Sequence, residues 1–311
     1  MRIIVFAVLL ASVAPAFAQK KSYTPPRTAD GQPDLQGIWN NSTVTPLERP
    51  PELGSKEFFT PAEALAYERS RVEQNNVDNR PKDVQTDVAA AYNQSWYDRG
   101  THVVKTMGTS LITGPDGKLP GLTPDGKQRA DVLADQRRLH PADGPESRSL
   151  TERCLLWPEA GPPMLPGPYN NNYRILQSRD YVTIEVEMIH DVRVIPLDNR
   201  PHLAAGVRQW LGDSRGHWDG NTLVVETSNF NDKSRFRGTT RDMRLTERFT
   251  RSDADTILYE FTVTDPETYT KPWTAQVTMS KSSGAMYEYA CHEGNYGMVG
   301  ILAGARAEEK K

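Results

Sequence analysis

From about residue 172 onward, the chain is a series of short segments in which apolar and polar residues alternate. In the clearest of these segments, the apolar positions all fall on one side of an extended backbone: Val182, Ile184, Val186 and Met188. A period of two residues is typical of a β-strand that buries one face. This pattern constrains the fold more than any other feature of the sequence, and it predicts a sheet with one buried side.

Further alternating segments follow at short intervals, separated by turns such as DGN, RSDADT and TDPETYT: HWDGNTLVVETSNF, RLTERFTR, TILYEFTV, KPWTAQVTMSK and AMYEYACHE. Tight turns between neighbouring strands favour antiparallel pairing. An open sheet has two unpaired edges, and closure into a barrel removes them. The predicted fold class is therefore mainly β, with the strands forming an antiparallel β-barrel.

The segment 43–150 has little such alternation, which indicates a long and partly helical insertion. Thr60 and Glu63 form the two ends of a capping box, which predicts that a helix starts after Thr60. Two PDG turns precede a second predicted helix over about 124–139. We expect a single barrel domain over 35–311, with the insertion packed on or over the barrel.

The first 18 residues, MRIIVFAVLLASVAPAFA, combine a basic start, an apolar stretch and small residues before Gln19. This order is typical of a secretory signal peptide. A membrane anchor is the alternative, but the apolar stretch has only about half of the roughly 20 residues that span a bilayer. We therefore expect residues 1–18 to be cleaved off and residues 19–34 to form a Pro-rich leader. We also expect export of the protein to a periplasm or out of the cell.

The chain has only two cysteines, Cys154 and Cys291. In an exported protein, a single cysteine pair is expected to form a disulfide. A zinc site is the alternative, but the CHE run that begins at Cys291 lacks a second ligand at helical spacing, and no CxxC or HExxH motif occurs. The sequence therefore predicts a disulfide between these residues and no metal site.

Charge and motifs disfavour several classes of partner and cofactor. The formal net charge is -3 and no run of Lys and Arg occurs, which argues against nucleic acid or an acidic membrane surface as partner. No stretch after the signal peptide is apolar enough for membrane insertion. The chain also lacks a dinucleotide or phosphate-binding loop. We therefore expect no cofactor and a small organic molecule as the partner.

Several stretches together resemble a large family of exported bacterial proteins that are mostly uncharacterised: PDLQGIW, EMIHDVR, GDSRGHWDGNTLVVET and YEYACHEGNY. These stretches are spread over nearly all of the mature chain. The resemblance implies membership of that family and carries no activity with it.

A second resemblance concerns the fold. GIW at 37–39 is similar to the G-x-W start of lipocalin-like barrels, and GHWDGNTLVVET is similar to a hairpin in related barrels that bind small ligands. The resemblance implies a lipocalin-like barrel. The sequence departs from that pattern because more than 100 residues separate GIW from the remaining strands.

Four clusters contain the candidate functional residues. The first, EVEMIHDVR, places Glu187, His190, Asp191 and Arg193 at a strand end and turn. The mouth of a barrel presents such polar groups to a ligand. Glu187 and His190 lie on opposite faces of a regular strand, so both face the interior only if the strand bulges. A solvated turn with an Asp191–Arg193 ion pair is the alternative.

The second cluster, WLGDSRGHWDGNT, contains Ser214, Arg215 and Trp218. Ser214 lacks the G-x-S-x-G spacing of a nucleophile elbow, which disfavours it as a nucleophile. We expect Arg215 to stabilise an anion and Trp218 to contact the substrate. The alternative is structural: Arg215 pairs with a carboxylate and Trp218 packs.

The third cluster, PGPYNNNY, contains Tyr169, Asn172 and Tyr173. Amide groups beside aromatic faces suit a phenol or a sugar, so we expect these three residues to bind substrate. A turn-rich loop is the alternative. The insertion offers a similar mixture of side chains: Tyr92, Asn93, Trp96, Tyr97 and Asp98.

The fourth cluster, YEYACHEGNY, places His292 and Glu293 beside the predicted disulfide. A histidine titrates near neutral pH and acts as a general base when a carboxylate faces it. The alternative is that His292 only satisfies a backbone carbonyl near the disulfide.

These observations favour an exported, cofactor-independent enzyme that transfers protons on a small, aromatic substrate held in the barrel, as a lyase or an isomerase. His190 or His292 is the expected base, Glu187 its partner or the acid, and Arg193 an anion-stabilising group. A non-catalytic protein that binds small molecules is one alternative. A carbohydrate-active hydrolase is another, although no pair of catalytic carboxylates can be identified.

Overall fold

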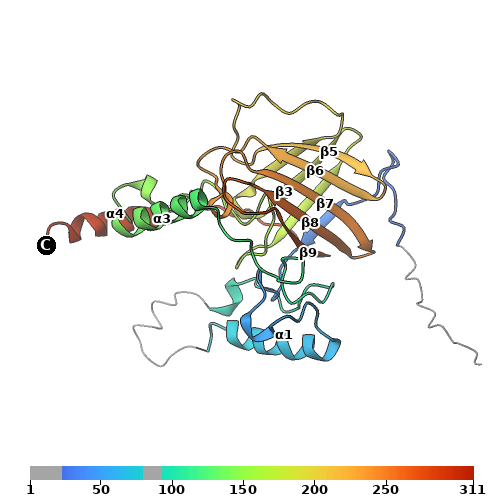
Figure 1. The fold of residues 1–311 in the computed structure, drawn as a ribbon, viewed down its shortest axis with the longest axis horizontal. Coiled ribbons are helices and arrows are strands. Elements are labelled where there is room, and N and C mark those ends of the chain that lie inside the picture. Colours follow the sequence, from blue (N-terminus) through green and yellow to red (C-terminus); the bar gives the residue numbers. More distant parts are fainter. Residues whose placement is uncertain (1–22, 80–92) are drawn as a thin grey trace, which may run out of the picture.

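The computed structural model describes residues 23–79 and 93–311, so the predicted signal peptide and Tyr92 lie outside the described residues. Nine strands form one antiparallel sheet that curls into a nearly closed barrel (Figure 1). The strands are β1 Gly37–Asn40, β2 Asn172–Gln177, β3 Tyr181–Val186, β4 Val192–Pro196, β5 Asp213–Asp219, β6 Thr222–Ser228, β7 Arg244–Asp253, β8 Thr256–Thr264 and β9 Trp273–Lys281.

Three α-helices of the described residues lie outside the barrel (Figure 1): α1 Pro61–Asn75, α3 Pro124–Leu139 and α4 Tyr296–Glu308. The capping box that predicted α1 is present, with Thr60 accepting from the backbone N–H of Glu63. Five short 3-10 helices complete the description: η1 Pro51–Leu53, η2 Gln94–Trp96, η3 Pro145–Ser147, η4 Met188–His190 and η5 Phe236–Gly238. The predicted mainly β fold, with an antiparallel barrel and some helical insertion, is confirmed.

The strand order is β4-β3-β2-β1-β9-β8-β7-β6-β5, and each neighbouring pair is antiparallel. Because the number of strands is odd, the two edge strands β4 and β5 point in the same direction. No backbone ladder joins them within the described part of the chain. We call the line where β4 and β5 meet the seam of the barrel.

Side chains close the seam where the backbone does not. A Cβ atom on Gly216 of β5 would lie only 2.9 Å from Ile195 and 2.8 Å from Leu197, so glycine allows β5 to approach β4 closely. Arg193 of β4 also donates to the Ser214 hydroxyl of β5 at 3.3 Å. The connection 197–212 then runs back along the seam from the end of β4 to the start of β5.

Large side chains fill the interior of the barrel. Five aromatic residues are essentially without solvent exposure: Trp39, Tyr173, Phe249, Tyr259 and Phe261. The apolar face that the alternation predicts is buried too, since Val182 and Ile184 are fully inaccessible and Val186 and Met188 are 2% exposed. The interior of the described barrel is therefore a packed core.

The insertion is attached to the sheet through β9. The short strand β1 pairs with only two residues of β9, Lys281 and Ser280, which leaves the rest of that edge free for another partner. The segment 111–113 occupies it: Gln276 donates to the carbonyl of Leu111 at 2.9 Å, and the N–H of Thr113 donates to Thr274 at 3.0 Å.

The predicted last strand, AMYEYACHE, is wrong. These residues have no regular structure, and the helix α4 follows them. Both neighbours of β9 are already in place, β1 on one side and β8 on the other, so no sheet edge is available there. The Cys154–Cys291 disulfide, which is confirmed, draws this segment toward residue 154 instead.

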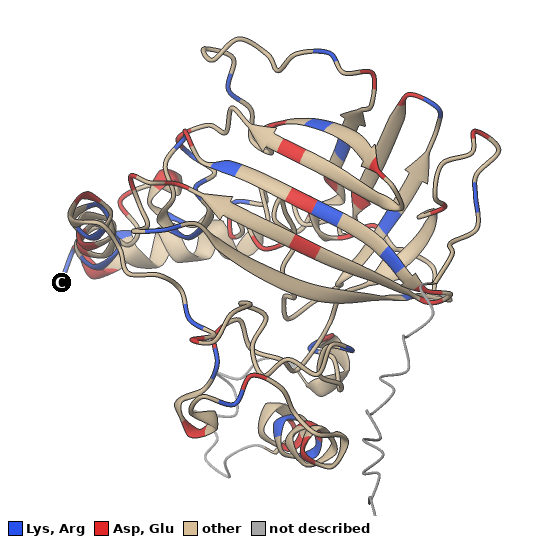
Figure 2. Cartoon of the chain, turned by 45° about the vertical axis from the view of Figure 1, so that its right-hand side comes forward, with Lys and Arg blue, Asp and Glu red and all other residues tan. Residues whose placement is uncertain are grey.

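Charges of both signs are interspersed on the outside of the sheet (Figure 2). Two cross-strand pairs illustrate this: Arg174 with Glu185 at 3.1 Å, and Arg248 with Asp219 at 3.0 Å. Each such exposed pair contributes at most about 1 kcal/mol to stability. Among the described helices, none is long and apolar enough to cross a membrane.

Candidate functional site

One end of the barrel gathers most of the polar loops. The strand registers place the end of β1, the start of β2, the β3–β4 turn, the β6–β7 connection and the start of β5 at this end. The insertion and the loop 157–168 pack there as well. We call it the cleft end, because an open cleft of about 280 Å³ lies beside it.

The cleft lies between the insertion and the loop that precedes β2. About half of its described lining residues are apolar, and the charged ones are three arginines and one glutamate. The lining residues are Thr43, Val44, Thr45, Pro46, Leu47, Arg71, Asn75, Arg99, Leu111, Glu159, Leu165, Pro166, Gly167, Pro168 and Arg237.

The three arginines carry charge that no carboxylate of the described residues neutralises. Arg71, Arg99 and Arg237 form no ion pair there, and neither does Glu159. The Glu159 carboxylate faces Gly167, because a Cβ atom on that glycine would lie 3.9 Å from its Oε2. The cleft therefore has an excess of positive charge.

An aromatic ring and a backbone carbonyl hold Arg99 in place, and Arg237 has an uncommon backbone conformation. The guanidinium of Arg99 lies 4.0 Å from the ring centroid of Tyr97, and its Nη1 donates to the carbonyl of Asn75 at 3.0 Å. Tyr97 stacks on Tyr169, with 5.2 Å between ring centroids. Arg237 has a φ of 48°, a conformation uncommon for residues other than glycine. Such strain is frequent at functional sites.

The buried amide of Asn171 and the carboxylate of Asp98 hold the loop 157–168, which forms one wall of the cleft, against the barrel. Asp98 Oδ2 accepts from Asn40 Nδ2 at 2.9 Å and from the backbone N–H of Asn171 at 3.1 Å. Asn171 in turn accepts from the N–H of Gly167 at 2.7 Å, and Gly167 lines the cleft. The asparagine-rich run thus links β1 and β2 to the wall.

Three of the predicted clusters meet at the cleft end. Asn172 Nδ2 donates to Glu187 Oε2 at 2.6 Å, and the backbone N–H of Tyr287 donates to Glu187 Oε1 at 3.0 Å. The third, first and fourth clusters are therefore joined through one buried carboxylate. The Asn172 amide and the Glu187 carboxylate are thus hydrogen-bonded to each other. Tyr169 instead stacks on Tyr97 beside the cleft.

The β3–β4 turn contains two consecutive left-handed residues, Ile189 with φ 60° and His190 with φ 48°. His190 is exposed, and so is His292 beyond the disulfide. Burial raises the pKa of the neighbouring Asp191 carboxyl to about 6, while the charge of His190 acts to lower it. The assignment of His190 or His292 as a base stays a prediction.

The raised pKa of Asp191 predicts a pH dependence of stability. The folded state binds the proton of the Asp191 carboxyl more tightly than the unfolded state does. The contribution of this proton to the free energy of unfolding is therefore complete below about pH 4 and is lost as the pH rises through about 6. Asp191→Asn is therefore expected to flatten the fall in unfolding free energy between pH 4 and 7, measured by urea denaturation. Equal slopes in the wild type and the variant would contradict the assignment.

Arg193 lies inside the barrel rather than at its mouth. Its guanidinium donates to Glu247 Oε1 at 3.1 Å and to Oε2 at 2.5 Å, and both side chains are at most 2% exposed. Burial lowers the pKa of Arg193, but the adjacent Glu247 carboxylate more than offsets this, so the pKa is raised. The Tyr259 hydroxyl also donates to Glu247 Oε1, at 2.8 Å.

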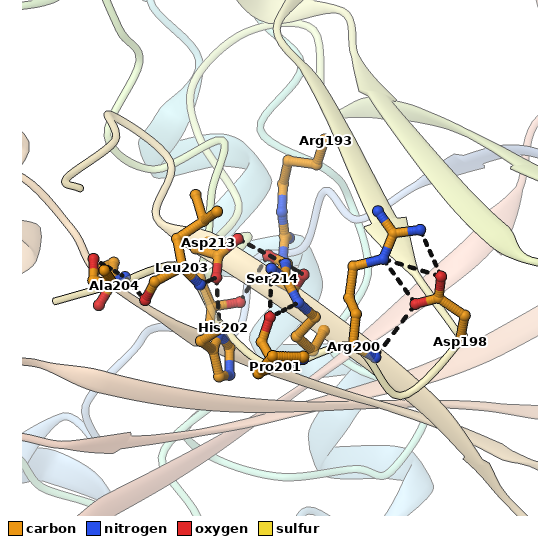
Figure 3. Close-up of polar contacts among 12 residues, drawn as sticks. Arg193, Asp198, Arg200, Pro201, His202, Leu203, Ala204, Asp213 and Ser214 are labelled. Atoms are coloured by element: carbon orange, nitrogen blue, oxygen red, sulfur yellow. Dashed lines mark hydrogen bonds and ion pairs between the residues drawn. The ribbon is translucent and has the colours of Figure 1, made fainter.

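Arg215 belongs to a polar cluster centred on Asp213 at the start of β5 (Figure 3). Asp213 accepts from Arg215 Nη1 at 2.6 Å, from His202 Nδ1 at 2.9 Å and from the N–H of Leu203 at 2.9 Å. Burial acts to raise its pKa, but these three hydrogen bonds together hold the pKa below its ordinary value. The cluster anchors the connection 197–212 along the seam.

The other two predicted substrate contacts lie elsewhere. Tyr173 is 2% exposed, and its side chain belongs to the core. Trp218 is paired with Leu223 near the end of β5, at the barrel end opposite the cleft. Among the described residues, no three His, Cys, Asp or Glu side chains lie close enough together to hold a metal ion.

The cleft arginines and His202 were not predicted from the sequence. Arg71, Arg99 and Arg237 come from α1, the insertion and the β6–β7 connection, and no local motif marks them. The only signal beside Arg99 is its position next to Tyr97 and Asp98. Comparison of the chain with protein-family models, with curated proteins and with solved structures gives no match.

Proposed function

We propose that this protein binds a small organic anion with an apolar part, in the cleft beside the barrel end. The observation that carries the proposal is the set of three cleft arginines, Arg71, Arg99 and Arg237, that have no carboxylate partner among the described residues. Arginine is well suited to this role because its planar guanidinium forms paired hydrogen bonds with carboxylates and phosphates.

These arginines have no carboxylate partner among the described residues, which is informative because other arginines of this chain are paired. Arg208 meets Asp242 at 2.7 Å, for example, and Arg241 meets Asp232 at 3.1 Å. A cleft with three cations and one carboxylate attracts an anion, and the low-dielectric walls strengthen that attraction. A ligand that carries one or two negative charges would restore the balance.

The apolar lining of the cleft defines the rest of the ligand. Leu47, Leu111 and Leu165 lie there with three prolines, so the uncharged part of the ligand is apolar. The cleft volume of about 280 Å³ is close to the lower end of ligand pockets, roughly 300 Å³. An aryl or alkyl carboxylate with a single ring fits this description.

A second candidate is proton transfer on the bound anion. Glu159 favours it, because this carboxylate lines the cleft without an ion pair or a hydrogen bond to its side chain among the described residues. In this hypothesis, the ligand is an oxo acid. Glu159 removes a proton from the carbon next to its ketone and then returns one, while the arginines stabilise the enolate charge.

We propose in addition that the protein is exported. The signal-like residues 1–18 and the Cys154–Cys291 disulfide both support an oxidising compartment.

Ligand binding can be tested with 3-phenylpropionate and its uncharged analogue 3-phenylpropanol, by isothermal titration calorimetry. We expect binding of the acid alone, and a loss of at least about tenfold in Arg99→Gln and in Arg237→Gln, because charge-assisted hydrogen bonds contribute roughly 1.5–3 kcal/mol. Arg174→Gln, on the outer face of β2, is the matched control and should bind like the wild type. Equal affinity of all four proteins would contradict the proposal.

Wild-type protein and a Glu159→Gln variant, both in D2O, test the second candidate. Wild-type protein is expected to speed the exchange of the hydrogens on the carbon next to the ketone of phenylpyruvate, as detected by NMR. Glu159→Gln should bind this acid and give exchange only at the uncatalysed rate. If the wild type exchanges these hydrogens only at the uncatalysed rate, the second candidate fails and the binding function remains as the proposal.

A further inference from the structure

A buried ion pair crosses the barrel beneath the cleft. Arg193 and Glu247 form two hydrogen bonds, and Arg193 also donates to Ser214, whose hydroxyl lies 2.9 Å from that of Thr227. All of these side chains are buried. Moving two charges out of water costs several kcal/mol for each ion, and apolar side chains would fill the same space more cheaply. We therefore expect the Arg193–Glu247 pair to have a role besides filling the core.

The Tyr259 hydroxyl carries this network to the loop that forms the cleft wall. It donates to Glu247 Oε1 at 2.8 Å and accepts from the backbone N–H of Met164 at 3.0 Å. Met164 is fully buried, and the next residue, Leu165, lines the cleft. The N–H of Leu165 donates at 2.7 Å to the carbonyl of Glu159, which is the only acidic residue of the lining.

The direction of these hydrogen bonds fixes the loop. Arg193 holds both oxygens of Glu247, so the carboxylate has one orientation. The Tyr259 hydroxyl points its hydrogen at that carboxylate and therefore presents a lone pair to Met164. Buried hydrogen bonds of this kind polarise one another and make the arrangement rigid.

We propose that Tyr259 is a positioning residue of the cleft, and that the Arg193–Glu247 pair beneath it holds the wall 159–165 in the shape that binds the anion. Tyr259 does not line the cleft itself. The role depends on the proposed function, because the wall matters for affinity only if the cleft binds a ligand.

Tyr259→Phe tests this role with the loss of one oxygen atom. The Phe249 and Phe261 rings that contact Tyr259, with centroids 4.9 Å and 5.6 Å away, would stay in place. We expect affinity for 3-phenylpropionate to fall roughly fivefold, the equivalent of one buried hydrogen bond. We also expect faster hydrogen exchange at the Met164 and Leu165 amides in the free protein.

Thr227→Val is the matched control, since it breaks a hydrogen bond at the other end of the same network and Thr227 is 1% exposed. It should lower thermal stability by a similar amount and leave affinity unchanged. Wild-type affinity in a folded Tyr259→Phe protein, or equal loss of affinity in both variants, would overturn the inference.

Two further outcomes separate the inference from the proposed function. If wild-type protein binds no anion, the proposed function fails. Separately, unchanged hydrogen exchange at the Met164 amide in Tyr259→Phe would overturn the role of the hydroxyl in fixing the wall. If Tyr259→Phe does not fold, the wild type still provides a test: saturation with 3-phenylpropionate should slow exchange at Met164 more than at Thr227. Equal protection at both amides would overturn the inference.

Discussion

Replacement of Glu247 by alanine is expected to lower the free energy of unfolding by about 3–5 kcal/mol, the usual cost of breaking a buried ion pair from one side. The side chain of Glu247 has no solvent exposure and that of Arg193 is 2% exposed, so water cannot replace the lost carboxylate. The variant would leave a buried cation, and the Tyr259 hydroxyl would lose the acceptor of its hydrogen. Urea denaturation measures this loss.

The same substitution on the outer face of the barrel provides the control. Glu185 meets Arg174 at 3.1 Å, with both side chains about one-third exposed, 31% and 39%. Glu185→Ala should cost no more than about 1 kcal/mol, because solvent screens an exposed pair. If Glu247→Ala were equally mild, the barrel core would not depend on this pair.

The disulfide gives the second large expected effect. Cys154→Ser combined with Cys291→Ser should lower stability by on the order of 4–5 kcal/mol, because the bridge closes a loop of 137 positions and removes entropy from the unfolded chain. The C-terminal segment should also become sensitive to protease, since few other contacts hold it. Asn295 Nδ2, which donates to the carbonyl of Glu152 at 2.8 Å, is one of them.

Reduction of the wild-type protein is the control for the disulfide prediction. Dithiothreitol should lower the melting temperature of the wild type to that of the double variant and leave the double variant unchanged. A double variant that melts with the oxidised wild type would show that the C-terminal segment unfolds independently of the barrel.

The strands could be predicted from the sequence because each buries one face, and burial produces period-two alternation within a few residues. The hairpin at DGN is the clearest case, where β5 and β6 flank Gly220 and Asn221. The same criterion failed for Tyr287, Tyr289 and Cys291, which alternate without an available sheet edge. Alternation of apolar and polar residues indicates that a segment can form a strand. The order of the strands in the sheet decides whether a neighbouring strand is available to pair with it.

The candidate site could be predicted only in part. Glu187 was predicted at a strand end and directly follows β3, and a hydrogen bond at 2.6 Å joins it to Asn172 of the asparagine-rich run. The cleft itself needs Arg71, Arg99 and Arg237, which are far apart in sequence and meet only because the insertion packs at the barrel end. The burial of Arg193 depends on Glu247, 54 positions later, and no local pattern indicates that pairing.

The most direct test of anion binding in the cleft is to locate a ligand that carries a heavy atom. In crystals soaked with 3-(4-bromophenyl)propionate, we expect one anomalous bromine peak near Leu47, Leu111 and Leu165, with the carboxylate density between Arg99 and Arg237. A peak in another part of the molecule, or no peak at a concentration that saturates binding in solution, would contradict the account.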